Sequence, residues 1–213
     1  ATFQLQDGSI NRGQAAFNFA LGQTAVTYFN SAAIVINDAT SATPYPSTIN
    51  VSGLGGQVSR ATVTLTNLNH TWPSDIDVLL VSPPPADSPT GRKALFMAKC
   101  GSSFTVNNVS LTFDDAATNS LPRFSQLVSG TNRPTSYALT TPPFPPALTP
   151  PPPYATNLAV FNGINPNGVW SLYVLDDSLG NIGVISNGWV LRLATAGTVP
   201  AAADLGLAMT VEP

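Results

Sequence analysis

Residues 58–83 read VSRATVTLTNLNHTWPSDIDVLLVSP and hold two clear strand patterns. Ala61, Val63 and Leu65 alternate with threonines, which is the two-residue period of a strand with one buried face. After a short polar loop, the continuous apolar run Val78–Val81 is typical of a strand that is covered on both faces. The stretch therefore predicts two core-forming strands joined as a hairpin.

Residues 165–193 repeat this arrangement with the sequence NPNGVWSLYVLDDSLGNIGVISNGWVLRL. Two strand patterns again flank a polar turn, and a pair of aspartates, Asp176 and Asp177, stands next to it. In each pattern the large apolar residues recur at every second position, so their side chains share one face. We expect a second core-forming hairpin, whose buried faces carry Trp170, Leu172 and Val174 in one strand and Trp189, Leu191 and Leu193 in the other.

Short motifs occur in a fixed order along the two stretches: His70-Thr71, Ser74-Asp75-Ile76 and Leu80-Val81-Ser82-Pro83, then Asn165-Pro166-Asn167-Gly168-x-Trp170-x-Leu172, Gly183-Val184-Ile185 and Trp189-x-Leu191-x-Leu193. Over roughly Ile34 to Ala194, this pattern resembles the P domain (P/Homo B domain) of the proprotein convertases. The resemblance implies an all-β fold, a two-sheet antiparallel β-sandwich of the jelly-roll, galactose-binding-like type. Ser74 departs from the family, whose Gly-Asp-Leu-like motif has glycine there, and the role of Asp75 in that motif is structural.

In that family the P domain follows a subtilisin-like protease domain. It is not the catalyst, but it stabilises the protease and modulates the response of the protease to calcium and pH. The resemblance therefore implies a non-catalytic module of a large secreted or surface bacterial protein, associated with serine-type endopeptidases and with proteolysis. The expected partners are neighbouring domains of the same polypeptide, including a subtilisin-like protease domain.

The composition favours a globular, β-rich protein outside the cytoplasm. Apolar residues make up 43% of the 213 residues and charged residues only 9%, well below the roughly 25% of an average domain. Glutamate occurs once and lysine twice, so little helix is expected. A net charge of −3 argues against a nucleic-acid-binding face. No apolar run approaches the roughly 18 residues of a membrane-spanning helix. We expect a secreted or cell-surface location.

The chain divides into three expected parts. Residues 1–33 form an N-terminal strap or edge strand, residues 34–196 the sandwich, and residues 197–213 a linker and the start of a following repeat. The last part resembles the opening strand of the tandem immunoglobulin-like repeats of large bacterial surface proteins. Eight prolines among residues 141–153 exclude an interior strand and predict a stiff surface loop, which a polyproline-binding partner could also use.

Aspartates are the candidate ligands for a metal ion. Calcium prefers oxygen ligands in irregular loops, and Asp177 with Asn181 has the spacing of such a site. Glycines in the same turn let the backbone fold back and present carbonyl oxygens. The alternative is that the aspartates cap turns by bonding to nearby backbone. The candidate calcium ligands are Asp176, Asp177 and Asn181, followed by Asp75, Asp77, Asp114 and Asp115.

The residue inventory argues against catalysis by this chain. His70 is the single histidine and stands in a turn without a nucleophile motif, so the sequence predicts a turn residue packed beside Trp72. Zinc would need several histidine or cysteine ligands. Cys100 has no second cysteine and is expected to be buried.

Loop aromatics leave a second function open, which is a carbohydrate- or matrix-binding jelly roll. Exposed rings can stack on sugars, and several aromatic residues fall in predicted loops. A glycan platform would need two or three of these rings to be coplanar and exposed. The candidate rings are Tyr45, Trp72, Tyr137 and Tyr154.

Overall fold

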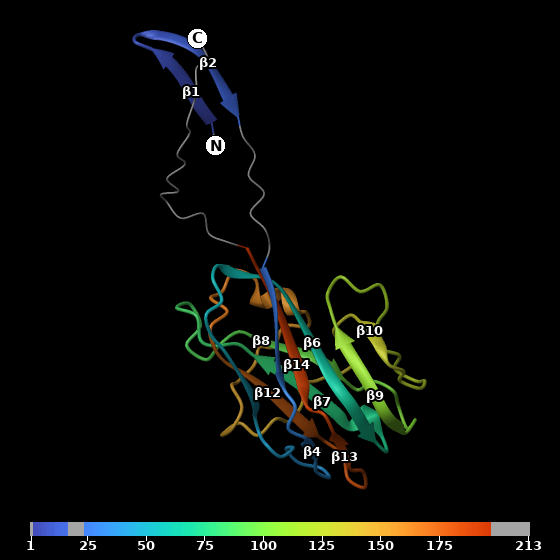
Figure 1. The fold of residues 1–213 in the computed structure, drawn as a ribbon. Helices are drawn as coiled ribbons and strands as arrows, with labels where there is room; N and C mark the ends of the chain where they lie inside the picture. The colour runs from blue at the N-terminus through green and yellow to red at the C-terminus, as the bar shows by residue number, and fades with distance from the viewer. Residues whose placement is uncertain (1, 17–23, 197–213) are drawn as a thin grey trace.

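The computed structural model describes residues 2–16 and 24–196, and it confirms the all-β sandwich (Figure 1). Strands account for 45% of the residues and helix for 4%, and two sheets pack face to face. The larger sheet contains β3 (Thr24–Asn30), β4 (Ile34–Ile36), β6 (Gln57–His70), β9 (Val106–Phe113), β10 (Gly130–Asn132), β13 (Gly183–Ile185) and β14 (Trp189–Ala196). The smaller sheet contains β5 (Ser47–Val51), β7 (Ile76–Val81), β8 (Lys93–Ala98), β11 (Thr135–Ser136) and β12 (Gly168–Asp176).

Two short 3₁₀ helices and a separate hairpin complete the described part of the chain. The helices are η1 (Pro73–Asp75) and η2 (Leu158–Phe161), and the hairpin joins β1 (Thr2–Asp7) to β2 (Ile10–Ala16). No helix among the described residues is long and apolar enough to cross a membrane.

Strand β7 is an interior strand, as its apolar run predicts. It pairs antiparallel with β8 on one side and with β12 on the other, and Val78 lies opposite Met97 and Val174. All six of its residues are buried. Alternate residues of a strand point to opposite faces, so the inner face joins the sandwich core and the outer face joins a second apolar cluster.

The two expected hairpins are wrong, although their strands are right. Strand β6 belongs to the larger sheet and β7 to the smaller one, so the turn between them carries the chain across the sandwich as a first arch. A second arch runs from β12 in the smaller sheet to β13 in the larger one. The period-two pattern shows that one face is buried, but a core shared by two sheets offers that burial to strands of either sheet. Pattern alone cannot distinguish a hairpin from an arch.

The two arches stack directly on each other. Their strands in the smaller sheet pair antiparallel, with Ile76 opposite Asp176, and their strands in the larger sheet also pair, with His70 opposite Gly183. The two turns therefore lie side by side at one end of the sandwich. This stacking brings the aspartates of the two quoted sequence stretches together.

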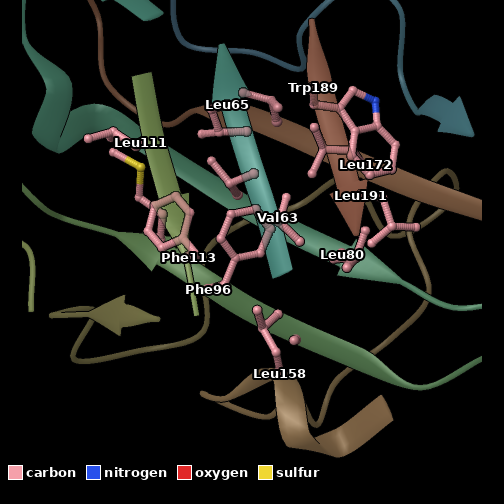
Figure 2. Packing of buried hydrophobic residues seen from close by; sticks show 14 of the residues in the cluster. Val63, Leu65, Leu80, Phe96, Leu111, Phe113, Leu158, Leu172, Trp189 and Leu191 are labelled. Atoms are coloured by element: carbon pink, nitrogen blue, oxygen red, sulfur yellow. The ribbon is translucent and has the colours of Figure 1, made fainter. Parts of the chain in front are cut away.

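The sandwich core is apolar and continuous between the sheets. Val63 and Leu65 of β6 and Trp189 of β14 face Leu80 and Leu172 of the smaller sheet (Figure 2). Both core tryptophans bond their indole N–H inside the protein. The Trp189 Nε1–H donates to Ser47 Oγ over 3.0 Å, and the Trp170 Nε1–H donates to the Pro166 carbonyl over 2.9 Å. The core position that the sequence predicts for both tryptophans is confirmed.

The sheets are mixed rather than purely antiparallel. The short strands β10 and β11 pair parallel with β9 and β8, respectively. After the long loop that follows β9, the chain returns so that Gly130–Asn132 lie opposite Leu111–Phe113, the last three residues of β9, and run in the same direction. Both parallel pairs lie at sheet edges.

The proline-rich residues 141–153 lie against the outer face of the smaller sheet. Phe144 is buried there, and its ring meets the Tyr154 ring at a centroid distance of 5.9 Å. Together with Leu79 and Tyr173 of the sheet, they belong to the second apolar cluster. The segment is a surface loop, as its prolines predict, and it also covers one face of the sheet.

Strand β3 belongs to the larger sheet, where it pairs along its length with β14. It falls within the range in which the sequence predicts a strap or an edge strand. The expected linker and following repeat, residues 197–213, lie outside the described residues.

Candidate functional site

The most unusual feature of the stacked arches is a buried pair formed by His70 and Asp176. His70 Nε2 lies 3.0 Å from Asp176 Oδ2, and neither side chain has any exposed surface. The backbone N–H of Trp72 donates to His70 Nδ1 over 3.1 Å, so the ring proton is carried by Nε2, the nitrogen that lies beside the carboxyl group without being aligned for a hydrogen bond. Asp176 Oδ1 accepts a hydrogen bond from the Ser178 N–H over 2.9 Å. The outer atoms of the pair, Nδ1 and Oδ1, are thus hydrogen-bonded to backbone, whereas Nε2 and Oδ2 have only each other as close polar neighbours.

Burial dominates the titration of this pair. It lowers the pKa of His70, although the charge of Asp176 acts in the opposite sense. It also raises the pKa of Asp176, although the Ser178 N–H and His70 favour the ionised carboxylate. Both shifts disfavour charge in the core. A second ring proton would also displace the Trp72 N–H from Nδ1, so the neutral imidazole is the form that fits this site.

Two more carboxyl groups lie next to the pair, at the beginning of β7. Asp77 is completely buried, and neither of its oxygens has a hydrogen-bond partner among the described residues. Burial raises its pKa to about 8, partly offset by Lys99. Burial, together with the charge of Asp176, raises the pKa of Asp75 to about 6. At neutral pH most Asp77 side chains are therefore protonated, which lowers the cost of leaving this group without a charged partner.

Lys99 supplies the positive charge at the outer side of the cluster. Its ammonium group forms an ion pair with Asp177 Oδ1. Lys99 directly follows β8. Its backbone has a φ of +57°, in the left-handed region that residues other than glycine seldom adopt. The turn at the end of β8 thus aims the lysine at the second arch.

The turn of the second arch is fixed by hydrogen bonds to two other segments, the loop of Asp38 and the turn of the first arch. Asp38 Oδ1 accepts from the Gly180 N–H over 2.7 Å. The Asn181 Nδ2–H donates to Asp75 Oδ2 over 3.2 Å, and the Thr71 hydroxyl donates to Asn181 Oδ1 over 3.0 Å. These contacts join the two arch turns to each other. Both polar groups of the Asn181 side chain are therefore in use.

Gly183 permits the close approach of the two arches. A Cβ atom at this position would overlap with the carbonyl oxygen of Asn69 and with Cδ2 of the His70 ring. Backbone and a fully packed ring cannot move aside without disturbing the buried pair. A hydrogen atom is thus the only side chain that fits at residue 183.

The structure brings together five of the seven candidate ligands. Asp75, Asp77, Asp176, Asp177 and Asn181 all lie where the two arches meet. The remaining two candidates lie elsewhere and have structural partners, since Asp114 accepts two hydrogen bonds from Arg60 and Asp115 Oδ1 accepts one from the Leu158 N–H. Burial acts to raise the pKa of Asp114, but the hydrogen bonds from Arg60 and from the Ala116 N–H act more strongly in the opposite sense. The net effect is a lowered pKa.

With Lys99 in place, the donor set does not fit a calcium ion. The adjacent carboxylates of Asp176 and Asp177 have separate partners, His70 and Lys99. Across residues 2–16 and 24–196, no three histidine, cysteine, aspartate or glutamate side chains are grouped to hold a metal. Calcium needs several converging oxygens, whereas here a lysine ammonium already meets the most accessible carboxylate. Calcium binding would require Asp177 to leave Lys99.

Three residues of the site have roles that sequence reasoning misses. The pairing of His70 with Asp176 joins residues 106 positions apart, and no local pattern indicates it. Asp38 is an isolated aspartate in a loop, and Lys99 follows a predicted strand without an acidic neighbour. The low lysine content is the one available signal, because only two lysines occur in the chain.

The loop aromatics are mostly tied into the fold. The hydroxyls of Tyr137 and Tyr154 donate to the carbonyls of Leu121 and Pro150, and the Tyr45 hydroxyl lies 2.5 Å from Thr149 Oγ1. All three tyrosines are half-buried. Trp72 has 44% of its surface exposed.

Comparisons with known proteins assign no family. No protein-family model matches the chain, and no curated protein matches it in sequence. Among solved structures, it is similar to a chain in the crystal structure of an Aeromonas sobria serine protease in complex with a chaperone. The similarity has 15% sequence identity and a TM-score of 0.39, and covers 84% of this chain and 27% of that chain. A likeness this weak does not assign a function.

Proposed function

We propose that this chain is a non-catalytic, P-domain-like module of a secreted or surface bacterial protein. Its role is structural: it packs against a neighbouring domain of the same polypeptide and stabilises it. The proposed neighbour is a subtilisin-like protease domain, by analogy with the family that the two arch sequences resemble. The strands of both arches are paired within the two sheets and contribute buried residues to the core, which suits a structural role.

The state of the single histidine carries this proposal. A serine-protease base must present a ring nitrogen to a nucleophile and to the substrate. Here Nδ1 accepts from the Trp72 N–H, Nε2 faces Asp176, and the ring has no exposed surface. A bound substrate could therefore not exchange a proton with His70. This arrangement supports a structural histidine that joins the sheets.

Calcium at Asp176, Asp177 and Asn181 stays a proposal of its own. It concerns stability and not catalysis, and it requires the Lys99 ammonium to give up Asp177. Nothing among the described residues favours the carbohydrate-binding alternative, since three of its four candidate rings are half-buried and their hydroxyls are engaged.

The proposal is tested on the longest polypeptide that the gene encodes. Thermal unfolding of the remaining domains is followed by calorimetry with and without residues 24–196. We expect deletion to lower the Tm of a neighbouring domain by several degrees, because a lost interface removes stabilising burial. An unchanged Tm, or a gene product without any further domain, would overturn the proposal.

A further inference from the structure

A surface groove of about 370 Å³ lies beside the carboxylate cluster. Lys99 and Asp177 form one wall, which is the exposed side of the cluster. Arg123, Phe124 and Tyr137 come from the loops around β10 and β11 and form another wall. The groove therefore lies at one end of the smaller sheet, where Lys99, Tyr137 and Asp177 directly follow β8, β11 and β12.

Arg123 is held in place without using its hydrogen-bonding capacity. Its guanidinium carbon lies 4.9 Å from the ring centroid of Phe124 and 5.7 Å from that of Tyr137. The Tyr137 ring is fixed in turn, because its hydroxyl donates to the Leu121 carbonyl over 2.8 Å. Among the described residues, the guanidinium makes no hydrogen bond and no ion pair. Stacking thus orients a planar group with five free N–H donors toward solvent.

The groove also has an apolar side. Phe124 has 73% of its surface exposed and Leu139 has 91%, and Pro143 of the proline-rich loop is exposed next to them. Single exposed apolar residues are common, but here several line one groove together with an oriented cation. The combination is typical of a site that binds a ligand with one charged and one apolar part.

The charges of the groove favour an anionic ligand. Lys99 and Arg123 contribute two positive charges and Asp177 one negative charge. The ammonium of Lys99 is neutralised by Asp177, which leaves the guanidinium of Arg123 as the uncompensated charge. A guanidinium binds a carboxylate through two parallel hydrogen bonds, a geometry that a planar, pre-oriented group makes at low entropic cost.

We propose that this groove binds an extended peptide segment in which an acidic side chain stands beside a bulky aliphatic residue. Arg123 binds the carboxylate, and Phe124 and Leu139 contact the aliphatic side chain. The inference rests on the proposed function, because the segment belongs to the neighbouring domain that the module stabilises. It deepens that function by naming the docking surface and the chemistry of the segment that docks.

The test uses the full chain and two blocked peptides, acetyl-Ala-Leu-Glu-Leu-Ala-amide and its glutamine counterpart. Peptide is titrated into ¹⁵N-labelled protein, and NMR shifts are followed at the Arg123 Nε–H and at the amides of Tyr137 and Thr140. We expect the glutamate peptide to bind in the millimolar range and the glutamine peptide about tenfold more weakly, since losing one charge-assisted pair is worth about one factor of ten.

Variants locate the binding. Arg123→Gln is expected to weaken binding of the glutamate peptide about tenfold, to the affinity of the glutamine peptide. Leu139→Ser is expected to weaken binding of both peptides to the same extent. The matched control is Arg192→Gln, which removes an exposed arginine of β14 and should leave binding unchanged. Tm measurements on each variant check that the fold is intact.

Three binding results would overturn the groove assignment, and so would self-association. They are equal affinity for the two peptides, unchanged affinity in Arg123→Gln, and stronger binding of galacturonate than of the glutamate peptide. Self-association of the chain through this face, detected by sedimentation, would replace the proposed occupant with a second copy and also overturn it. If domain deletion lowers the Tm of the neighbour while Arg123→Gln binds normally, the proposed function stands and the groove assignment fails. If domain deletion leaves the Tm of the neighbour unchanged while Arg123→Gln weakens the glutamate peptide's binding, the groove assignment stands and the proposed function fails.

Discussion

His70 and Asp176 connect the two sheets of the sandwich, with Nε2 of one 3.0 Å from Oδ2 of the other and both side chains fully buried. His70 ends β6 in the larger sheet and Asp176 ends β12 in the smaller sheet. A buried polar pair of this kind costs desolvation energy, and a comparable apolar contact could stabilise the fold equally well. Its significance is that neither partner can be removed without leaving the other unsatisfied.

Asp176→Ala is therefore expected to lower the free energy of unfolding by about 1–3 kcal/mol, the usual cost of leaving a buried neutral polar group without its partner. Urea denaturation at neutral pH measures the change. The control is Asp87→Asn, which breaks an exposed pair with Arg92 and should cost less than about 1 kcal/mol. Equal effects of the two substitutions would show that the buried pair is dispensable.

Asp77→Asn is expected to change how stability depends on pH. Burial raises the pKa of Asp77 from 3.8 to about 8, so the folded state holds its proton more tightly than the unfolded state. The stability that Asp77 contributes is fully present below pH 3.8 and is lost as the pH rises through about 8. Asparagine resembles the protonated acid and does not ionise. Above pH 8 the free energy of unfolding of the variant should thus exceed that of the wild type by a few kcal/mol.

Chemical denaturation of both proteins at pH 5, 7 and 9 measures this difference. His70 is present in both proteins, so its contribution largely cancels in the comparison, whereas the repulsion between Asp75 and Asp77 is part of the measured difference. His70 acts in the opposite direction, because its lowered pKa makes the folded state lose stability as the pH falls below 6.5. Parallel pH profiles for the wild type and Asp77→Asn would mean that Asp77 is ionised without cost in the fold.

Gly183→Ala is expected to destabilise the protein by about 1–3 kcal/mol, the range for overpacking a tight contact. The added methyl group would overlap with the Asn69 carbonyl and the His70 ring. Gly55→Ala serves as the control, since a Cβ at that residue meets nothing within 4 Å. Thermal unfolding distinguishes the two variants, and a Gly183→Ala Tm equal to that of Gly55→Ala would contradict the close contact of the arches.

Lys99→Gln tests the calcium proposal. Removal of the ammonium group frees Asp177, so millimolar calcium should raise the Tm of this variant more than that of the wild type. Excess chelator should reverse the shift, and Asp177→Asn introduced into the variant should abolish it. The calcium proposal fails if the Tm of Lys99→Gln is the same with calcium and with chelator.

Much of the fold is predictable because burial leaves a periodic trace in the sequence. The apolar run of β7 and the alternation around Trp170 and Trp189 predict interior strands, and all of these residues are buried. The partner of each strand is not predictable in this way. An arch and a hairpin bury the same faces, so only the three-dimensional pairing shows that β6 and β7 lie in different sheets.

The candidate site is partly predictable for a related reason. Aspartates at strand ends mark the two arch turns, and these turns are stacked, which brings Asp75 and Asp77 to Asp176 and Asp177. The partners of the carboxylates are not predictable from the sequence. Adjacent side chains of an extended chain point apart, and here they reach His70 inside the sandwich and Lys99 outside it. Neither His70 nor Lys99 is near Asp176 and Asp177 in sequence.

A peptidase assay on the purified full chain tests directly whether this module is non-catalytic. Fluorescent casein is incubated with the protein between pH 5 and 9, beside a His70→Gln variant and a buffer control. No release of fluorescence above buffer is expected for either protein, because the His70 ring is buried, with Nδ1 accepting from the Trp72 N–H and Nε2 facing the interior beside Asp176. Cleavage by the wild type that a serine-protease inhibitor blocks and that His70→Gln abolishes would contradict this expectation.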